Sequence, residues 1–235
     1  MSTTYETRRG EVQAYFDRTA FDAWARLTSD APLGRIRASV RAGRERMRAA
    51  LLEALGTELR GKRILDAGCG TGALAVEMAR RGAEVLAVDL SPQLIELARR
   101  RSPEDLGAGS VLWVSGDMLD PSFGAFDHVV GMDSLIHYEA QDMAQAIAKL
   151  APRTRISMQL SFAPRNPALA LMHFVGRMLP RANRAPSIVP IGVERLLWQL
   201  RQEESLAAFA VRPGARIHSG FYTAQRLGLQ RRGGM

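Results

Sequence analysis

The sequence predicts an α/β protein with a mostly parallel sheet that ends in an antiparallel hairpin, joined by N-terminal helices and an inserted helical cap. Over residues 57–163, short apolar runs alternate with segments of helical periodicity, an order typical of parallel strands covered by helices. Residues 206–227 hold two strand-like runs around Pro213 and Gly214, which is a hairpin signal. LDAGCGTG, residues 65–72, is a glycine-rich turn after the first strand, where open α/β sheets bind ligands.

Each element is predicted from the spacing of apolar residues and from helix start and stop signals. Apolar residues recur at helical spacing over 9–28, and a second helix over 34–55 ends at Gly56. Ser91 is a favourable N-cap and Pro92 suits the first position of the helix that follows. By the same criteria, further helices are expected over 71–82, 91–101 and 141–151, and strands over 63–67, 84–90, 110–117, 126–133 and 153–161.

Three units are expected along the chain. Residues 1–56 form an N-terminal helical lid, and 57–163 together with 206–235 form the core. Within 164–205 the strand–helix alternation stops and five prolines occur, but the apolar content is too high for a linker. This stretch is therefore predicted to be a cap over the substrate site.

Composition narrows the class of protein. Of 235 residues, 46% are hydrophobic and 24% charged, which is typical of one soluble domain, and we expect it in the cytoplasm. The single cysteine excludes an internal disulfide and a cysteine-clustered metal site, and no metal site is expected. The net charge of +8 includes a dense arginine run over 34–48. This run is either a solvated helix face or a site for an acidic ligand, an anionic membrane surface or nucleic acid.

The glycine-rich turn fits two kinds of cofactor. Gly68, Gly70 and Ala73 satisfy the dinucleotide pattern, and Asp89 can hold a ribose diol in a nicotinamide enzyme or in an S-adenosylmethionine enzyme. Asp66, two residues before Gly68, would repel a pyrophosphate but suits the amino group and sulfonium of S-adenosylmethionine. The acid therefore favours S-adenosylmethionine, with S-adenosylhomocysteine as the product.

A third acid lies at the carboxyl end of the third predicted strand. Asp117 can accept a hydrogen bond from the adenine amine, with Met118 as an apolar neighbour of the ring. We read Cys69 as a small residue that fits the turn. The predicted cofactor-binding residues are Asp66, Gly68, Cys69, Gly70, Asp89, Leu90, Gly116, Asp117, Met118 and Met132.

The motifs LDAGCGTG, AVDLS, SGDM and FDHVVGMDSLIHY resemble those of class I S-adenosylmethionine-dependent methyltransferases, which implies a Rossmann-like sheet. The likeness extends to YFDRTAFDAWARL near the N-terminus, to LSFAPRNP, and to SGFYTAQRL near the C-terminus. These segments resemble the magnesium-protoporphyrin IX O-methyltransferases and cover almost the whole chain. The resemblance implies methylation of one porphyrin propionate on the route to chlorophylls and bacteriochlorophylls.

The resemblance also implies site residues. His137, in MDSLIHY, is expected to orient the reacting carboxylate as the catalytic residue. Relatives generally carry a substrate-site tyrosine where this chain has Thr28, so this chain has no phenol to act at that position. Arginines are the natural partners of the second propionate. The predicted substrate-binding residues are Tyr15, Thr28, Arg37, Arg41, Tyr138, Arg165 and Arg177.

Other functions stay open at this point. A quinone or a small phenol is an alternative acceptor, and a porphyrin-binding protein without activity or a nicotinamide dehydrogenase are further alternatives. MDSLIHY replaces the Asn/Asp-Pro-Pro-aromatic motif of base-methylating enzymes, so no nucleic-acid partner is expected. Basic charge and an apolar cap indicate transient contact with magnesium chelatase and with the membrane surface, which would make the protein peripherally membrane-associated.

Overall fold

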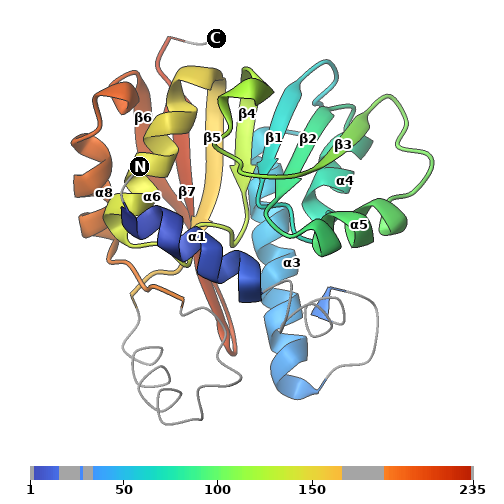
Figure 1. Cartoon of the computed structure of the whole chain (residues 1–235), viewed down its shortest axis with the longest axis horizontal. Helices are drawn as coiled ribbons and strands as arrows, with labels where there is room; N and C mark the ends of the chain where they lie inside the picture. The colour runs from blue at the N-terminus through green and yellow to red at the C-terminus, as the bar shows by residue number, and fades with distance from the viewer. Residues whose placement is uncertain (1–2, 16–26, 29–33, 166–187, 234–235) are drawn as a thin grey trace.

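The computed structural model describes residues 3–15, 27–28, 34–165 and 188–233. Its centre is a seven-stranded sheet in the order β3-β2-β1-β4-β5-β7-β6 (Figure 1). β1 to β5 are parallel, whereas β7 pairs antiparallel with β5 and with β6. The predicted sheet, parallel and then antiparallel at the end, is confirmed.

The elements follow the predicted order. The strands are β1 (Arg63–Ala67), β2 (Glu84–Asp89), β3 (Ser110–Ser115), β4 (Phe126–Gly131), β5 (Thr154–Phe162), β6 (Phe209–Ser219) and β7 (Tyr222–Arg231). The α-helices are α1 (Thr3–Tyr15), α3 (Arg35–Leu55), α4 (Ala73–Arg80), α5 (Pro92–Arg101), α6 (Ala140–Leu150) and α8 (Val193–Arg201). Short 3-10 turns lie at η2 (Pro121–Phe123), η3 (Ala151–Arg153) and η5 (Glu204–Leu206).

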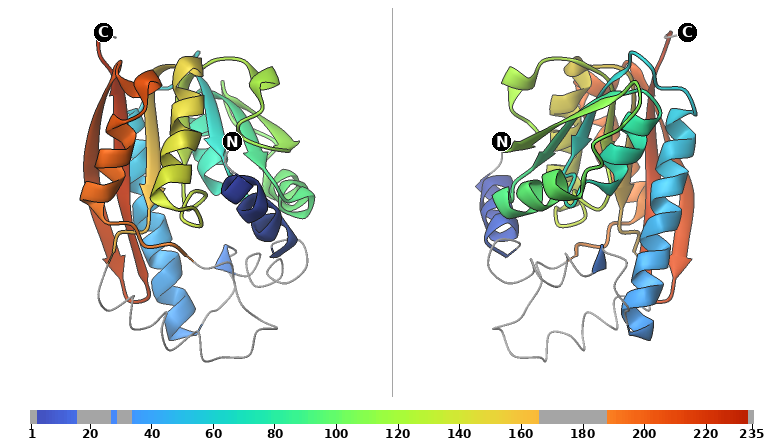
Figure 2. Two further views of the ribbon diagram at one scale, coloured as in Figure 1. Left: turned by 60° about the vertical axis from the view of Figure 1, so that its left-hand side comes forward. Right: turned by 90° about the vertical axis from the view of Figure 1, so that its right-hand side faces the viewer.

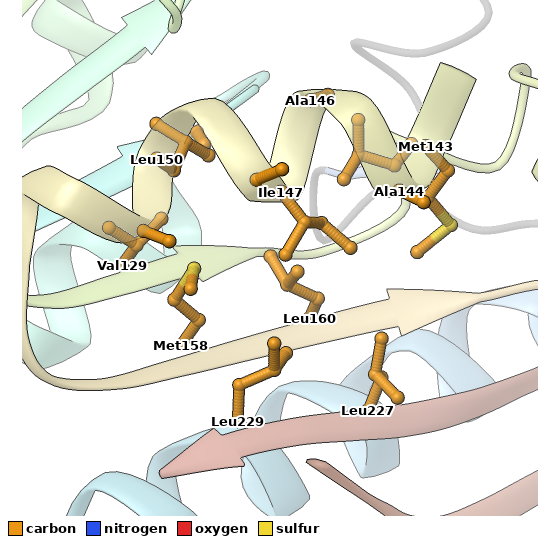
Figure 3. Packing of buried hydrophobic residues seen from close by; sticks show 14 of the residues in the cluster. Val129, Met143, Ala144, Ala146, Ile147, Leu150, Met158, Leu160, Leu227 and Leu229 are labelled. Atoms are coloured by element: carbon orange, nitrogen blue, oxygen red, sulfur yellow. The ribbon is translucent and has the colours of Figure 1, made fainter. Parts of the chain in front are cut away.

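Two hydrophobic cores fill the space between the sheet and its helices. On one face, Met47 and Leu51 of α3 pack with residues of α4 and α5 against the sheet. On the other face, α6 and α8 lie over β4, β5 and β7, and the two views of Figure 2 place α3 and α6 on opposite sides. Figure 3 shows Ile147 of α6 above Leu160 of β5, with Met158 of β5 and Leu227 of β7 nearby. Covering both faces is what a mostly parallel sheet requires.

Two boundaries differ from the prediction. The N-terminal helix begins at Thr3 instead of residue 9, and residues 16–26 of the expected range lie outside the described residues. The hairpin turn is not at Pro213 and Gly214, because β6 continues through them with a bulge before Arg216. β6 is an edge strand, where the missing N–H of proline leaves no ladder partner unsatisfied. The turn lies at Gly220, whose φ of 56° suits glycine.

The cap expected over 164–205 stays a prediction as a unit, because residues 166–187 lie outside the described part. Of the rest, α8 packs on α6, and its Leu196 and Leu200 are buried in the same core as the sheet. No described helix has the length and apolar character needed to cross a membrane.

The glycine-rich turn between β1 and α4 has a physical reason for its composition. Gly68, Gly70 and Gly72 have φ values of 81°, 56° and 84°, which side-chain-bearing residues rarely adopt. A Cβ on Gly72 would also lie 2.4 Å from the ring of Trp113. The turn can therefore be tight and still let α4 and the indole of β3 approach its backbone.

Gly72→Ala is expected to destabilise the fold more than Gly107→Ala does. Both positions have positive φ, but a Cβ at Gly107 meets nothing within 4 Å. The strain common to both is about 1–2 kcal/mol, and overpacking against Trp113 adds about 1–3 kcal/mol at position 72. Urea unfolding of both variants measures the difference. Equal losses would mean that contact with Trp113 contributes nothing.

Candidate functional site

A cavity lies at the carboxyl ends of the parallel strands. Its walls come from the turns after β1, β2, β3 and β4, from α1, and from one face of α3. Because parallel strands all end at the same edge of a sheet, residues that are far apart in the sequence meet there. The described residues that line it include Gly68, Cys69, Gly70, Asp89, Leu90, Gly116, Asp117, Met118 and Met132. Nine of the ten predicted cofactor-binding residues are thus brought to one cavity.

Asp66 is the predicted cofactor residue that does not line the cavity. It lies at the end of β1, is 1% exposed, and accepts a hydrogen bond from the backbone N–H of Ala75 in α4. Its Oδ2 atom is buried with no hydrogen-bond partner among the described residues. Burial, with a smaller contribution from Asp89, raises the pKa of Asp66 to about 7. A cationic group nearby would stabilise its ionised form.

Asp89 and Asp117 hold the loops on which they lie. The Gly70 N–H donates to Oδ2 of Asp89 at 2.8 Å, and the Ser91 N–H donates to Oδ1 at 3.0 Å. Asp117 accepts from the Leu119 N–H at 2.9 Å. Arg9 of α1 also reaches Asp117, with 2.5 Å between Nη1 and Oδ2. The carboxylate predicted to face the adenine amine is therefore one of the points at which α1 is tied to the core.

α1 lies near the carboxyl ends of the parallel strands (Figure 1), and its Tyr5, Val12 and Gln13 line the cavity. Tyr5 is 2% exposed and stacks on Tyr138, with 4.8 Å between ring centroids. The Thr4 hydroxyl donates to Asp142 at 3.0 Å. The sequence prediction missed Tyr5 because the helix was expected to begin after it, and no motif marks this position.

The predicted substrate residues are only partly brought together. His137, Tyr138, Thr28 and Arg41 line the cavity, and His137 is buried. Thr28 accepts a hydrogen bond from Arg101 Nη1 at 3.1 Å. Tyr15, Arg37 and Arg165 are absent from the lining, and Arg177 lies outside the described residues.

α3 contributes more of the cavity wall than was predicted. Arg41, Arg44 and Arg48 all line it, at the spacing that places them on one helix face. This spacing was visible in the arginine run, but the run alone did not separate exposed from inward positions. Arg44 pairs with Asp133, which also lines the cavity and belongs to MDSLIHY.

Two other features bear on chemistry. Burial raises the pKa of the Cys69 thiol, with Asp66 and Asp89 adding to the effect, so the sulfur is held protonated and unreactive. No group of three or more His, Cys, Asp or Glu residues suited to a metal ion occurs in the described ranges.

Comparisons with known proteins agree with this geometry. A family model described as "Magnesium-protoporphyrin IX methyltransferase C-terminus" matches residues 131–231, and a "Methyltransferase domain" model matches 64–155. The magnesium-protoporphyrin O-methyltransferase of Rhodobacter capsulatus is 43% identical over 97% of this chain and 98% of its own length. The chloroplastic enzyme of Arabidopsis thaliana is 30% identical over 79% of this chain and 62% of its own.

Among solved structures, the magnesium protoporphyrin IX methyltransferase of Synechocystis PCC 6803 with bound SAH has a TM-score of 0.80. It is 26% identical, and the match covers 95% of this chain and 99% of that one. The sheet order and the cavity at its carboxyl edge define a class I S-adenosylmethionine-dependent methyltransferase. Within that class, the chain belongs to the magnesium-protoporphyrin O-methyltransferase family. The family resemblance noted in the sequence is confirmed.

The pKa of Asp66 predicts how cofactor affinity depends on pH. Because burial raises this pKa, the carboxyl is largely protonated at pH 6 and largely ionised at pH 8. Affinity for S-adenosylhomocysteine is expected to fall about tenfold from pH 8 to pH 6, since its ammonium group is stabilised by the ionised form. Titration calorimetry at both pH values measures this change.

The Asp66→Asn variant serves as the control. It is expected to bind more weakly and without this pH dependence. Without ligand it should be more stable than the wild type at pH 8, because ionisation of a buried acid destabilises the folded state as pH rises toward 7. An unchanged pH profile in the variant would show that Asp66 only caps α4.

Proposed function

We propose that this protein transfers a methyl group from S-adenosylmethionine to a propionate carboxylate of magnesium-protoporphyrin IX, which gives the monomethyl ester and S-adenosylhomocysteine. The observation that carries the proposal is a single cavity that joins the glycine-rich turn and Asp89 to His137. The 43% identity over 97% of the chain to an enzyme named for this substrate supports the choice of acceptor.

The residues present suit the cofactor. The turn of positive-φ glycines leaves its backbone accessible, and Asp66, whose buried Oδ2 has no hydrogen-bond partner among the described residues, lies in β1 two residues before Gly68. Asp89 would hold the ribose, and Asp117 with Met118 would hold the adenine. When bound, S-adenosylmethionine supplies a methyl group on a positively charged sulfur.

The acceptor needs little help from a base. A propionate has a pKa of roughly 4.3, so it is already ionised at neutral pH. Orientation can contribute roughly 7–11 kcal/mol, compared with about 3–5 kcal/mol for the 10²–10⁴-fold gain of acid–base catalysis. The chain's main task is therefore to align the oxygen and exclude water. Buried His137 is suited to orient the carboxylate by a hydrogen bond.

Arg41 is the strongest of the four proposed partners for the second propionate, because it lines the cavity whereas Arg37 and Arg165 do not. Arg41 also donates from Nε to the Leu27 carbonyl at 3.1 Å, a contact that holds its side chain at the cavity wall. Tyr138 lies next to His137 in the same wall.

We further propose that residues 1–56 act as a lid over the site and residues 164–205 as a cap. The lid is tested by limited proteolysis, in which the cofactor is expected to protect the N-terminus from cleavage.

The assay uses the purified chain with methyl-labelled S-adenosylmethionine and magnesium-protoporphyrin IX. One methyl ester per porphyrin is expected by mass spectrometry. His137→Ala is expected to lower kcat about 10- to 100-fold, the effect of losing one hydrogen bond to a charged group, with a smaller change in porphyrin KM. The porphyrin supplies its own magnesium, so a chelator that leaves it intact should not reduce turnover.

Two outcomes would contradict the proposal. Methylation of a quinone or small phenol, with none of the porphyrin, would assign a different acceptor to the same fold. Wild-type turnover in His137→Ala would remove the orienting role while leaving the reaction in place.

We also propose contact with an anionic membrane surface. Ile36 and Phe221 are 57% and 49% exposed, and Ser39 links them by donating to the Ile36 carbonyl and accepting from the Phe221 N–H. Exposed Arg35 and Arg37 flank Ile36 on α3. Apolar side chains beside arginines suit the interface of a bilayer that carries negative charge.

Flotation with phosphatidylglycerol vesicles tests this contact. Replacing Ile36 and Phe221 with serine should reduce bound protein at least about threefold, since each loses burial at the interface. Trp198→Ser is the matched control, because Trp198 is 55% exposed on α8. Loss of binding in the control alone would move the membrane contact to α8. No binding of the wild type would remove the contact and leave a protein partner such as magnesium chelatase.

A further inference from the structure

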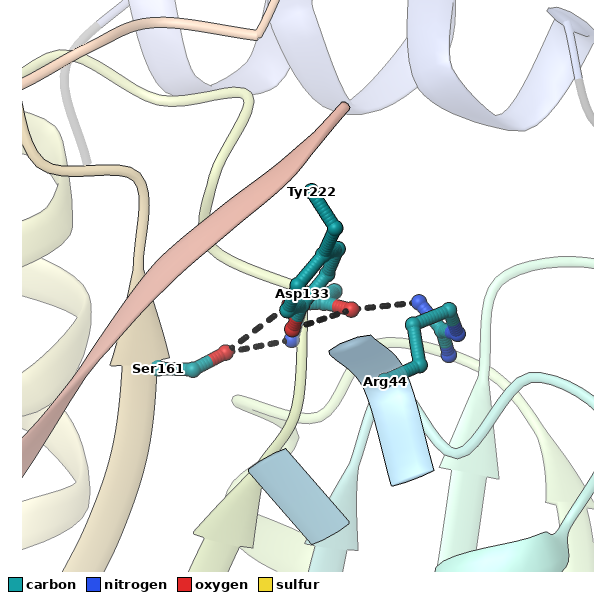
Figure 4. A network of polar contacts seen from close by, with 4 residues as sticks. All are labelled: Arg44, Asp133, Ser161 and Tyr222. Carbon is teal, nitrogen blue, oxygen red and sulfur yellow. Dashed lines mark hydrogen bonds and ion pairs between the residues drawn. The ribbon is translucent and has the colours of Figure 1, made fainter. Parts of the chain in front are cut away.

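Asp133 is a polar residue of the cavity that several side chains hold in place. It is the second residue after β4, its side chain is 4% exposed, and it contacts three separate elements (Figure 4). The Tyr222 hydroxyl of β7 donates to its Oδ1 at 3.0 Å, the Ser161 hydroxyl of β5 donates to Oδ1 at 3.1 Å, and Arg44 of α3 pairs with Oδ2. The Asp133 N–H also donates to the Ser161 oxygen at 2.8 Å.

The backbone at Asp133 indicates that these contacts hold it in place. Its φ is 58°, and it is the only residue other than glycine with a positive φ in the described ranges. Such a conformation costs about 1–3 kcal/mol and persists where surrounding contacts determine it. Aspartate tolerates it better than most residues. Three hydrogen bonds and an ion pair at one residue offset the cost.

The ring of Tyr222 packs against α3 at Gly43. A Cβ at Gly43 would lie 2.4 Å from the Tyr222 ring, so glycine at this helical position lets the ring lie against the helix backbone. Glycine inside a helix costs about 1 kcal/mol relative to alanine. Burial and the charge of Asp133 raise the pKa of the Tyr222 phenol, which keeps the hydroxyl protonated as a donor.

The loop after Asp133 carries His137 and is anchored at both ends. At its far end Tyr138 stacks on Tyr5, and the Ile136 carbonyl accepts from the Val189 N–H at 2.8 Å. At the near end, Asp133 ties the loop to α3 and β7 by the side-chain contacts described above. His137 lies between the two anchors.

We propose that Asp133, held by Tyr222, Ser161 and Arg44, is a positioning residue that fixes the loop of His137 for methyl transfer. The inference rests on the proposed function for its catalytic consequence. Because orientation is the main contribution that this reaction needs, a shift of about 1 Å in His137 can lower the rate about 100-fold. The C-terminal hairpin thereby takes part in the site through Tyr222, although its strands lie at the edge of the sheet.

The test compares four variants. Asp133→Gly keeps the positive φ but removes the carboxylate, and is expected to lower kcat about 30-fold. Asp133→Asn keeps an acceptor oxygen and should restore part of this loss. Tyr222→Phe keeps the ring packing and should lower kcat about tenfold. In all three, KM for S-adenosylmethionine should stay within about threefold, because the glycine-rich turn is not altered.

Thr223→Val is the matched control on the same strand. It removes the contact between Thr223 and Nδ1 of His218, which is 2.9 Å long, and should leave kcat unchanged. The imidazole Cε1–H signals in NMR spectra give a readout that does not need activity, since the chain has four histidines. Asp133→Gly and Tyr222→Phe should shift the His137 signal, and Thr223→Val only that of His218.

The outcomes separate the two proposals. An inactive wild type would overturn the proposed function, and the NMR signals would still decide the anchoring role of Asp133. An active wild type with unchanged kcat and an unchanged His137 signal in both Asp133→Gly and Tyr222→Phe would overturn the positioning role alone. A lower melting temperature with a normal kcat in both variants would also overturn the positioning role, because the contacts of Asp133 would then contribute only to the stability of the fold. If Asp133→Gly fails to fold, Tyr222→Phe decides.

Discussion

The cavity depends on the close approach of two loops, those that follow β1 and β4. A Cβ on Gly68 would lie 2.3 Å from the Cβ of Ser134, so neither loop could keep its place if position 68 carried a side chain. Adjacent pairing of β1 with β4 brings the two loops together, and the tight turn of glycines lets them touch. The glycine-rich turn thus serves both access to the backbone and the fit between loops.

This contact has consequences on both sides. On the β1 side it holds the turn that directly follows Asp66, a buried carboxyl group whose ionisation carries an electrostatic cost. On the β4 side it sets where the loop of His137 begins, and Asp133 then fixes its direction. A single crowded point in the backbone therefore relates the proposed cofactor residues to the residues proposed to face the acceptor.

The fold was predictable because it depends on local patterns. Apolar periodicity, Ser91 as an N-cap and Gly56 after a helix each determine an element within a few residues, and the structure bears them out. The hairpin turn predicted at Pro213 was wrong because a proline can continue a strand that lies at the edge of a sheet. Whether a strand lies at the edge is decided by tertiary structure. For the site, the glycines and acids at strand ends were predictable because topology brings strand ends together. Tyr5 and Tyr222 were not, because their roles depend on packing between segments distant in the sequence.

The charges of the cavity explain why so basic a chain can suit a cation-bearing cofactor. Asp89 and Asp117 come from the sheet side, whereas Arg41, Arg44 and Arg48 come from α3. Glu45 of α3 also lines the cavity, so the α3 wall carries three arginines and one acid and is positive on balance. A cavity with acids on one wall and a net positive charge on the other orients a ligand that carries both signs. The ion pair between Arg44 and Asp133 joins the two walls and lowers the field between them. For the proposed reaction, the sulfonium would lie toward the acids and carboxylates toward α3. In this reading the arginine run has two parts. The helical repeat turns Arg41, Arg44 and Arg48 toward the cavity, where they would recognise a ligand, and leaves Arg35 and Arg37 exposed to solvent.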